Sequence, residues 1–301
     1  MLAELDRLGT IAAVARYLHQ AAPGVSMQLS ALERDVGVAL TEKDGRSVRL
    51  TPAGRVLAQH GLDIVERLTL AEMEVRALRD GAAGTYRVAA FPSAARTIVA
   101  ATWAELLTAG HSSLHIELVE MEPREASSAL RAGDVDLAIT HTYSTLEPID
   151  SRHLSVWPLH VEPVWFAAPA ARGLTGPIDL QRFAAEDWLV PRRDTSCYDM
   201  VVRACGAAGF SPHVTAQATD FSVLLALVSA GAGVALIPEL SIDRLPGGVQ
   251  LISLERPVDR HLFLAARSSS AGDPGLARLR AAIARAASML VKQSVDHHRI
   301  E

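Results

Sequence analysis

The chain has 301 residues, about twice the length of a typical domain, which predicts two domains and a connecting segment. Apolar residues make up 49% and charged residues 21% of it, which excludes disordered, collagen-like and low-complexity proteins. Because the formal net charge is −5, any contact with nucleic acid must be local. Two cysteines, Cys197 and Cys205, cannot form a disulfide framework and lack the spacing of a zinc site, so we expect a reducing compartment.

The sequence also bears on cellular location. Acidic residues occur among the first six positions and no apolar core follows them, so the N-terminal segment does not read as a secretory signal. The most apolar stretch, residues 223–237, is interrupted by two glycines and is shorter than the ~20 residues of a membrane span. We therefore expect a cytoplasmic protein that does not contact a membrane.

Residues 1–54 read as short helices separated by turn signals. Ala12–Leu18 is predicted to form one helix and His19–Ala22 the turn after it. Because proline is tolerated at a helix start, the next helix is predicted over Pro23–Asp35, and Gly37 ends it.

The predicted second helix has one apolar face. Val25, Leu29 and Leu32 recur at i, i+4 and i+7, so small polar side chains remain on the outer side. Two short helices joined by a tight turn are the arrangement that places the second helix in the major groove of DNA. The same arrangement is also a common packing unit in helical domains, so DNA binding and simple packing are about equally favoured by geometry alone.

Residues 41–50, TEKDGRSVRL, follow this helix. Asp44-Gly45 is a hairpin turn signal, so the segment is predicted to form a two-stranded wing that brings Lys43, Arg46 and Arg49 near a backbone phosphate. Residues 1–60 carry seven Lys or Arg against six Asp or Glu, a net charge of +1, which predicts weak non-specific affinity.

The identities of these residues favour DNA binding over simple packing. Over nearly its full length, the segment from Gly9 to Gly54 resembles the N-terminal domain of LysR-type transcriptional regulators. The specific matches are Val14-Ala15, Leu18, Pro23, Ser26, Leu29, Leu32-Glu33, Gly37, Leu40 and Leu50-Thr51-Pro52-Ala53-Gly54. The resemblance implies a winged helix-turn-helix. The residues that we expect to contact double-stranded DNA are Pro23, Ser26, Met27, Gln28, Ser30, Arg34, Lys43, Arg46, Arg49 and Thr51.

The chain departs from the family pattern at four of these positions or beside them. Family proteins usually carry Gln at the position of Ala22, Arg or Gln at that of Met27, Phe at that of Thr41 and Arg at that of Lys43. We therefore expect this chain to recognise an operator sequence different from those of other family members. The family's first helix is usually about two turns longer than the eight residues before Gly9 allow, so we expect a clipped first helix and a start codon further upstream.

Residues 55–80 read as one helix with an apolar seam. The seam residues are Leu57, Gly61, Ile64, Leu68, Ala71, Val75 and Leu78, at alternating spacings of four and three. Packing of this seam against a second copy predicts a two-fold dimer that matches a pseudo-palindromic site, with Leu57, Ile64, Leu68, Val75 and Leu78 as dimerisation residues. The alternative is packing on the chain's own domain.

From residue 86 onward, strand patterns alternate with helix patterns, which predicts an α/β architecture. The predicted strands are 86–91, 114–121, 135–141, 161–168, 187–190, 234–237 and 262–266, with a further strand from 213. The predicted helices are 94–107, 124–132, 196–208, 221–230 and 275–290. This region is similar to the effector-binding domain of LysR-type regulators, which resembles a type 2 solute-binding protein, with crossovers near Val161 and His261.

The predicted organisation is multidomain. A winged helix-turn-helix domain (1–56) precedes a linker and dimerisation helix (57–80), a hinge (81–85) and an α/β effector-binding domain (86–301). That last domain has two subdomains, one comprising 86–160 and 268–301 and the other comprising 161–267.

Ligands of open α/β sheets lie at the carboxyl ends of strands, where turns into helices present free N–H groups. Three such turns begin at Phe91, Arg192 and Thr219, and a polar or anionic small molecule would suit their hydroxyls and amides. The predicted effector-binding residues are Ser93, Ala94, His141, Arg192, Thr195, Ser196, Thr219, Asp220 and Phe221. Each hydroxyl is also explained as a helix cap, a role that does not exclude ligand binding, and Arg192 and Arg193 are explained as partners of nearby aspartates. Cys197, in the first turn of a helix, reads as redox-responsive or as a buried, inert thiol.

The usual catalytic and phosphate-binding motifs are absent from the sequence, among them G-x-S-x-G, G-x-x-x-x-G-K, H-E-x-x-H and C-x-x-C. We therefore expect no enzyme and no cofactor or metal. The favoured function is a DNA-binding transcriptional regulator, a dimer or tetramer, controlled by a small-molecule effector, with RNA polymerase as a further candidate partner. The alternative is a small-molecule-binding α/β protein whose helical N-terminus serves only oligomerisation.

Overall fold

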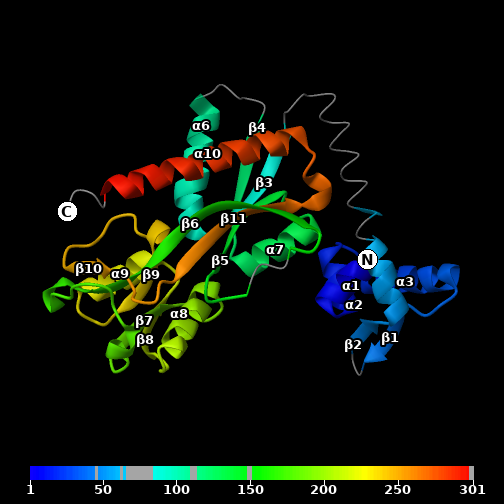
Figure 1. Cartoon of the computed structure of the whole chain (residues 1–301). Helices are drawn as coiled ribbons and strands as arrows, with labels where there is room; N and C mark the ends of the chain where they lie inside the picture. The colour runs from blue at the N-terminus through cyan, green and yellow to red at the C-terminus, as the bar shows by residue number, and fades with distance from the viewer. Residues whose placement is uncertain (45–46, 62–63, 66–83, 109–113, 148–150, 298–301) are drawn as a thin grey trace. The chain divides into compact units, whose positions relative to one another are not determined.

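The computed structural model describes residues 1–301 apart from 45–46, 62–63, 66–83, 109–113, 148–150 and 298–301 (Figure 1). The chain divides into two compact units, Met1–Arg76 and Ala77–Glu301, and each has its own hydrophobic core. Among the helices described, none combines the length and the apolar character that crossing a bilayer would require.

The first unit contains α1 (Leu2–Leu8), α2 (Ile11–Tyr17), α3 (Ala22–Val36) and a hairpin of β1 (Thr41–Asp44) and β2 (Ser47–Leu50). A further helix covers residues 52–61 and 64–65. The two predicted helices and the hairpin are thus confirmed, with boundaries that differ by one residue. The core comprises Leu2, Leu5, Val14, Ala15, Val25, Leu29, Leu40, Leu50 and Ala58.

Local chemistry explains where these helices begin and end. Thr10 caps α2, since its hydroxyl accepts a hydrogen bond from the Ala13 N–H. Gly37 ends α3 in the left-handed conformation, at φ 79°, as predicted. At Gly54 a Cβ would lie 2.0 Å from the Leu40 carbonyl oxygen, so only glycine lets the following helix pack this closely against the chain before the wing.

The second unit is built on a mixed sheet in the order β10-β6-β11-β5-β3-β4, with β9 paired to β6. Its strands are β3 (Gly84–Ala90), β4 (Leu114–Glu120), β5 (Leu137–Tyr143), β6 (Leu154–Pro169), β9 (Ala235–Pro238), β10 (Val249–Ile252) and β11 (Asp259–Arg267). A parallel pair, β7 (Asp187–Pro191) and β8 (His213–Ala218), joins β9 through a bridge between Trp188 and Val234.

Helices cover both faces of this sheet. In the first half, α5 (Pro92–Ala94), a π-helical turn (Ala95–Val99) and α6 (Ala100–Thr108) form one continuous helix that packs with α10 (Pro274–His297). α7 (Pro123–Ala132) lies against β3, β5 and β11 (Figure 1). In the second half, α8 (Ser196–Ala207) and α9 (Phe221–Ser229) each follow a strand of the parallel pair. The predicted α/β alternation is confirmed.

The starts of two predicted strands are wrong, and one strand was not predicted. β3 begins at Gly84, not at Tyr86, because residues 84 and 85 already pair with β4, so the hinge cannot extend to residue 85. β6 begins at Leu154, before the predicted residue 161, because it pairs with β11 along both halves, with a bulge between Leu262 and Phe263. β10, which the pattern did not predict, adds a strand beside β6.

Candidate functional sites

The outward side of α3 carries the side chains that the sequence assigned to it. Val25 and Leu29 are buried in the core of the first unit, and Leu32 packs against it. Exposed on the other side are Pro23, Ser26, Met27, Gln28, Ser30 and Arg34. Met27, at 73% exposed, adds an apolar side chain to this face. The predicted face is therefore confirmed, and its contact with DNA stays a proposal.

Glu33 fastens the wing to α3. Its carboxylate accepts hydrogen bonds at 2.9 Å from the N–H groups of Leu40 and Thr41 and from the Thr41 hydroxyl. Burial alone would raise the pKa of Glu33, but these three donors lower it below its usual value. The hairpin is thus held at a fixed place relative to the outward side of α3.

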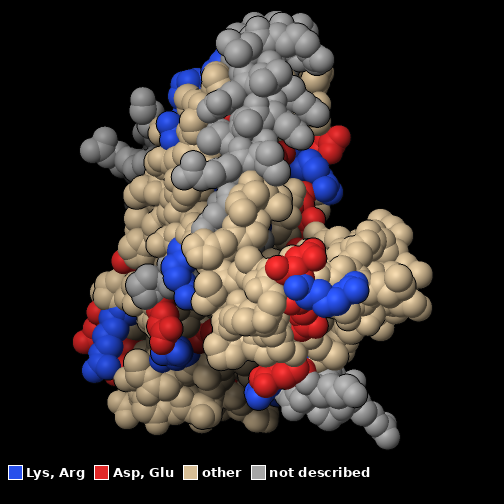
Figure 2. Space-filling model, turned by 90° about the vertical axis from the view of Figure 1, so that its right-hand side faces the viewer, with Lys and Arg blue, Asp and Glu red and all other residues tan. Residues whose placement is uncertain are grey.

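The wing cations are only partly described. Arg49 is exposed and pairs with Glu42 of the facing strand at 2.9 Å. Arg46 and the side chain of Lys43 lie outside the described residues. Thr51 has a structural task, since its hydroxyl donates to the Ala39 carbonyl at 2.8 Å and accepts from the Gly54 N–H at 3.0 Å. On the face of the molecule that Figure 2 shows, basic and acidic side chains lie beside one another.

The predicted dimerisation seam is described only at its start. Leu57 packs partly against the core of the first unit, whereas Ile64 is 59% exposed. Leu68, Val75 and Leu78 lie outside the described residues. The seam therefore stays a prediction, with Ile64 as its clearest unpartnered apolar residue in the described segment.

A small cavity of about 110 Å³, the cleft pocket, lies in the second unit where the turns after β3 and β7 meet. Its lining includes the predicted residues Ser93, His141, Thr195, Thr219, Asp220 and Phe221, together with Phe91, Pro92, Arg96, Glu122, Pro191, Cys197, Ser241 and Arg260. The expectation that these turns converge is supported by this geometry.

Three predicted effector residues do not line the cleft pocket. Ala94 is fully buried, so its side chain packs in the core. Arg192 is exposed and forms a short ion pair with Asp194 of its own turn. Ser196 faces a neighbouring hollow. Thr195 and Asp220 cap α8 and α9 while they line the cavity, so capping and pocket lining coexist in these side chains.

The floor of the cleft pocket holds a buried ion pair. Arg260 of β11 and Glu162 of β6 are each 1% exposed and form a short ion pair. The second oxygen of the Glu162 carboxylate accepts from the Leu240 N–H at 2.6 Å, and Arg260 donates to the Ser93 hydroxyl at 3.3 Å. Burial by itself would lower the pKa of Arg260, but Glu162 raises it above its usual value, so the guanidinium stays charged.

His141 stands beside this pair as a neutral base. Its ring makes an edge contact with Phe91, at 4.5 Å between centroids, and its Nε2 lies 3.1 Å from the Ser196 hydroxyl. Burial, and after it the charge of Arg260, lowers the pKa of His141 well below its usual value.

Next to His141, the Cys197 thiol lies 3.1 Å from the Tyr143 hydroxyl, and burial raises the pKa of that thiol to about 11. Of the two sequence interpretations of Cys197, the buried, unreactive thiol fits this geometry.

Three polar atoms of the cleft pocket are buried without a hydrogen-bond partner among the described residues: Glu122 Oε2, His141 Nδ1 and Ser241 Oγ. An unpaired buried polar group costs about 1–3 kcal/mol, so three in one small cavity indicate a place where a polar ligand or water completes the bonding.

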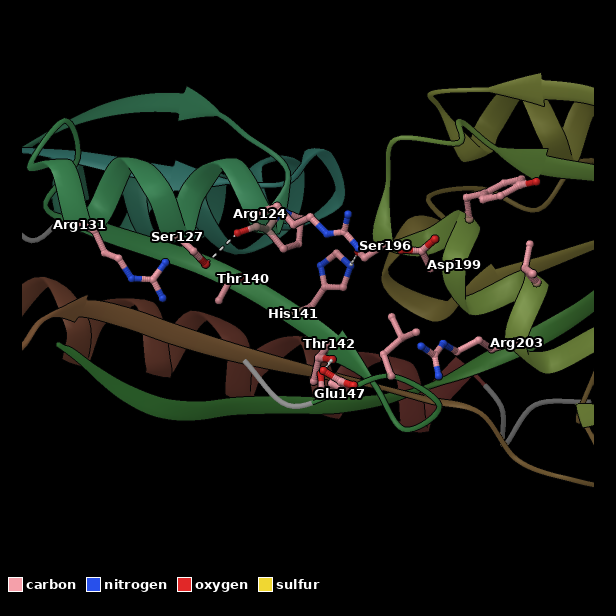
Figure 3. A pocket seen from close by; sticks show the side chains of 14 residues that line it. Arg124, Ser127, Arg131, Thr140, His141, Thr142, Glu147, Ser196, Asp199 and Arg203 are labelled. Atoms are coloured by element: carbon pink, nitrogen blue, oxygen red, sulfur yellow. Dashed lines mark hydrogen bonds and ion pairs between the residues drawn. The ribbon is translucent and has the colours of Figure 1, made fainter. Parts of the chain in front are cut away.

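A larger hollow of about 690 Å³ lies between α7 and α8, with β5 as its floor (Figure 3). Its lining includes Arg124, Arg131, Arg203, Asp199, Thr140, His141 and Ser196. His141 therefore contributes to both pockets. Across the hollow Arg124 donates to the Asp199 carboxylate at 3.0 Å, which links the two helices.

One cluster has the residue types of a metal site, namely His160, Glu162 and Glu239, whose ligand atoms lie within 4.8 Å of one another. Both oxygens of Glu162 are already used by Arg260 and the Leu240 N–H. A buried guanidinium beside the cluster also repels a cation. The donor set therefore does not fit a metal ion well.

Several pocket residues were missed by sequence reasoning, above all Arg260, Glu162 and Ser241. A signal was present for Glu162, which is a charge within an otherwise apolar strand pattern, VEPVWFA. Such a charge must be exposed or paired. Arg260 lies between Asp259 and His261 at the polar start of its strand, and Ser241 lies in a short turn three residues after Pro238, so neither carries a comparable signal.

Two family models match the sequence. "Bacterial regulatory helix-turn-helix protein, lysR family" covers residues 1–55 and "LysR substrate binding domain" covers residues 79–288. The transcriptional regulator TfdS of Cupriavidus pinatubonensis is 32% identical over 234 residues, which are 76% of this chain and 77% of that protein.

Solved structures share the fold. An OxyR mutant of Corynebacterium glutamicum with H2O2 bound has a TM-score of 0.62 at 21% identity, over 99% of this chain and 95% of the other. Full-length CbnR in complex with its target DNA has a TM-score of 0.55 at 23% identity, over 95% of this chain and 97% of the other.

Proposed function

Because the chain belongs to the LysR family of transcriptional regulators, we propose that it reads promoter DNA with the outward side of α3 and that a small polar or anionic effector in the cleft pocket changes this binding. The chain is a regulator and not an enzyme.

The observation that supports the effector site is the set of unpaired buried atoms in the cleft pocket, on Glu122, His141 and Ser241. The buried Arg260 guanidinium and the Ser93 hydroxyl add donors beside them. A cavity of about 110 Å³ limits the bound part to a few heavy atoms. The two halves of the unit meet at this cavity, so a ligand there favours whichever arrangement of the halves contacts it best.

For the DNA site, the support is the exposed face of α3 beside a hairpin that Glu33 holds in place. Ser26 and Gln28 have the hydroxyl and amide groups that read base edges, and Arg49 has the charge that contacts phosphate. A dimer through the seam that starts at Leu57 and Ile64 would present two such helices to a pseudo-palindromic site in the cytoplasm, with RNA polymerase as the further partner.

The test is the affinity of the full chain for duplex DNA from upstream of its own gene, measured by fluorescence anisotropy over a salt series. We expect affinity that falls steeply with salt. Gln28→Ala should change the preference among base substitutions by about 1–3 kcal/mol. Arg46→Ala should weaken binding to all sequences and reduce the salt slope by about one.

A matched control is Arg182→Gln, an exposed arginine of the second unit, which should bind DNA as the wild type does. If the chain forms oligomers that are insensitive to salt and have no affinity for any duplex, α3 is not a DNA-reading helix, and the interpretation as a ligand-binding protein with an oligomerisation arm replaces this one.

A further inference from the structure

We propose that the hollow between α7 and α8 is a second ligand site, which takes a small organic molecule with an anionic group at each end. It differs from the cleft pocket in place, size and charge, so it goes beyond the proposed effector site.

The hollow has the size of a ligand site. Its volume of about 690 Å³ lies within the ~300–1,000 Å³ usual for small-molecule sites. α7 belongs to the first half of the unit and α8 to the second, and β5 lies between them. Figure 3 shows Arg131 and Arg203 reaching into it from opposite ends, with Thr140 and His141 between them.

Arginines outnumber carboxylates in the lining, three to two: Arg124, Arg131 and Arg203 against Glu147 and Asp199. Arg124 is engaged by Asp199, but that pair is exposed, 81% and 38% at the two side chains, and such pairs contribute little. Among the described residues no partner is found for Arg203. Guanidinium groups bind carboxylates in a two-pronged geometry, so arginines on both helices favour a ligand with two anionic groups.

The floor of the hollow has a hydroxyl that the protein leaves unused. Thr140 is 2% exposed, and its Oγ1 has no partner among the described residues. A buried hydroxyl without a partner is costly, and a ligand oxygen over β5 would relieve that cost. This hydroxyl places the middle of the ligand, whereas the arginines place its ends.

The wall between the arginines is partly apolar. Leu146 and Val202 both line the hollow, the first half-buried and the second 38% exposed. A carbon chain between two charged ends would cover them, which inorganic phosphate cannot do. We therefore infer an organic dianion rather than a single anion.

The experiment is calorimetric titration of the full chain with glutarate, at constant ionic strength set with NaCl, and in parallel with inorganic phosphate. We expect glutarate to bind at one site per chain and phosphate to bind more weakly. Loss of one charge-assisted contact should weaken glutarate binding by about tenfold in Arg203→Gln and in Arg131→Gln. Arg182→Gln, outside both pockets, should bind as the wild type does.

Thr140→Val separates a role of the hydroxyl in ligand binding from a role in stability. It keeps the shape of the side chain and removes a hydroxyl that has no described partner, so the melting temperature should stay the same or rise while glutarate affinity falls. Asp199→Asn should strengthen binding, since it frees Arg124 and removes a negative charge.

Three results would overturn the proposal: no glutarate binding, phosphate binding equal to glutarate binding, or binding that Arg203→Gln and Thr140→Val leave unchanged. If Ser93→Ala abolishes glutarate binding and Arg203→Gln does not, glutarate occupies the cleft pocket, and the proposed effector site stands while the second site is lost.

Discussion

The two pockets of the second unit hold their charges in opposite ways. In the cleft pocket Arg260 is buried and its charge is balanced by Glu162, so a ligand there would be recognised by a few fixed hydrogen bonds. In the hollow between α7 and α8, Arg124 and Arg203 are exposed, and so is the ion pair of Arg124 with Asp199 that spans the hollow. The first arrangement would select a ligand because the wrong one leaves buried donors and acceptors unpaired. The second would attract anions by charge.

The largest effect is expected at the buried pair. Glu162→Gln leaves a charged guanidinium unpaired in the interior, so the free energy of unfolding should fall by about 3–5 kcal/mol, measured by urea denaturation of the full chain. The double variant Glu162→Leu with Arg260→Met should recover most of this loss, since an apolar pair avoids the desolvation cost. A single variant as stable as the wild type would mean that the pair is hydrated and the cleft pocket is open.

The reaction rates of the two thiols of the second unit test whether solvent reaches its interior. Burial raises the pKa of Cys197 to about 11 and that of Cys205 to about 12. Because the thiolate is the reactive form, both should react with an aromatic disulfide at pH 8 at rates on the order of 100-fold below those of the denatured chain. Fast labelling of Cys197 alone would show that the cleft pocket admits solvent and that this cysteine is suited to redox chemistry.

His141, which both pockets share, predicts a dependence of stability on pH. Burial holds its pKa well below the usual value, so as the pH falls below about 6.5 the unfolded chain binds a proton that the folded chain does not bind. Stability should therefore fall towards acid, with a contribution from His141 of up to about 1.4 kcal/mol per pH unit.

The measurement is urea denaturation between pH 7.5 and roughly 5.5, for the wild type and for His141→Gln. The variant should show the smaller slope, with a remainder from His160, whose pKa is also lowered by burial. Equal slopes in the two proteins would mean that His141 is solvated and is protonated in the folded state as easily as in the unfolded one.

The smallest effect is expected at the exposed pair across the hollow. Arg124→Gln should change the free energy of unfolding by less than about 1 kcal/mol, because Arg124 is 81% exposed and its partner Asp199 is 38% exposed. Urea denaturation checks this beside Glu162→Gln. If Arg124→Gln lowers the free energy of unfolding as much as Glu162→Gln does, the ion pairs of the two pockets do not differ in strength.

The first unit was predictable because its information is local. The spacing of Val25 and Leu29, the proline near the start of α3 and Gly37 at its end are sequence neighbours, and each maps to one physical cause. Local signals also predicted the turns at Ser93, Thr195 and Asp220, since helix caps after strands gather at one edge of a sheet. They did not predict the hydrogen-bond partners of these three side chains.

What escaped prediction depends on contacts between distant segments. Arg260 and Glu162 are 98 residues apart, and only the pairing of β6 with β11 shows that both are buried. Arg192 was wrongly placed in the cleft because charge alone does not tell whether a side chain faces inward, and its own neighbour Asp194 holds it outside. The end of the predicted hinge and the predicted starts of two strands were wrong for the same reason, since strand pairing sets where β3 and β6 begin.

The most direct measurement of the central claim combines Ser241→Ala with a panel of small organic acids and amino acids. Ser241 is buried in the cleft pocket and its hydroxyl lacks a partner in the described chain, so the variant should melt at the same temperature or higher. The affinity of the full chain for its upstream DNA is then measured with each compound at fixed ionic strength. We expect at least one compound to change DNA affinity in the wild type by about 5–150-fold, and much less in the variant. A wild type that no compound affects, or a variant that responds as the wild type does, would contradict an effector site in the cleft pocket.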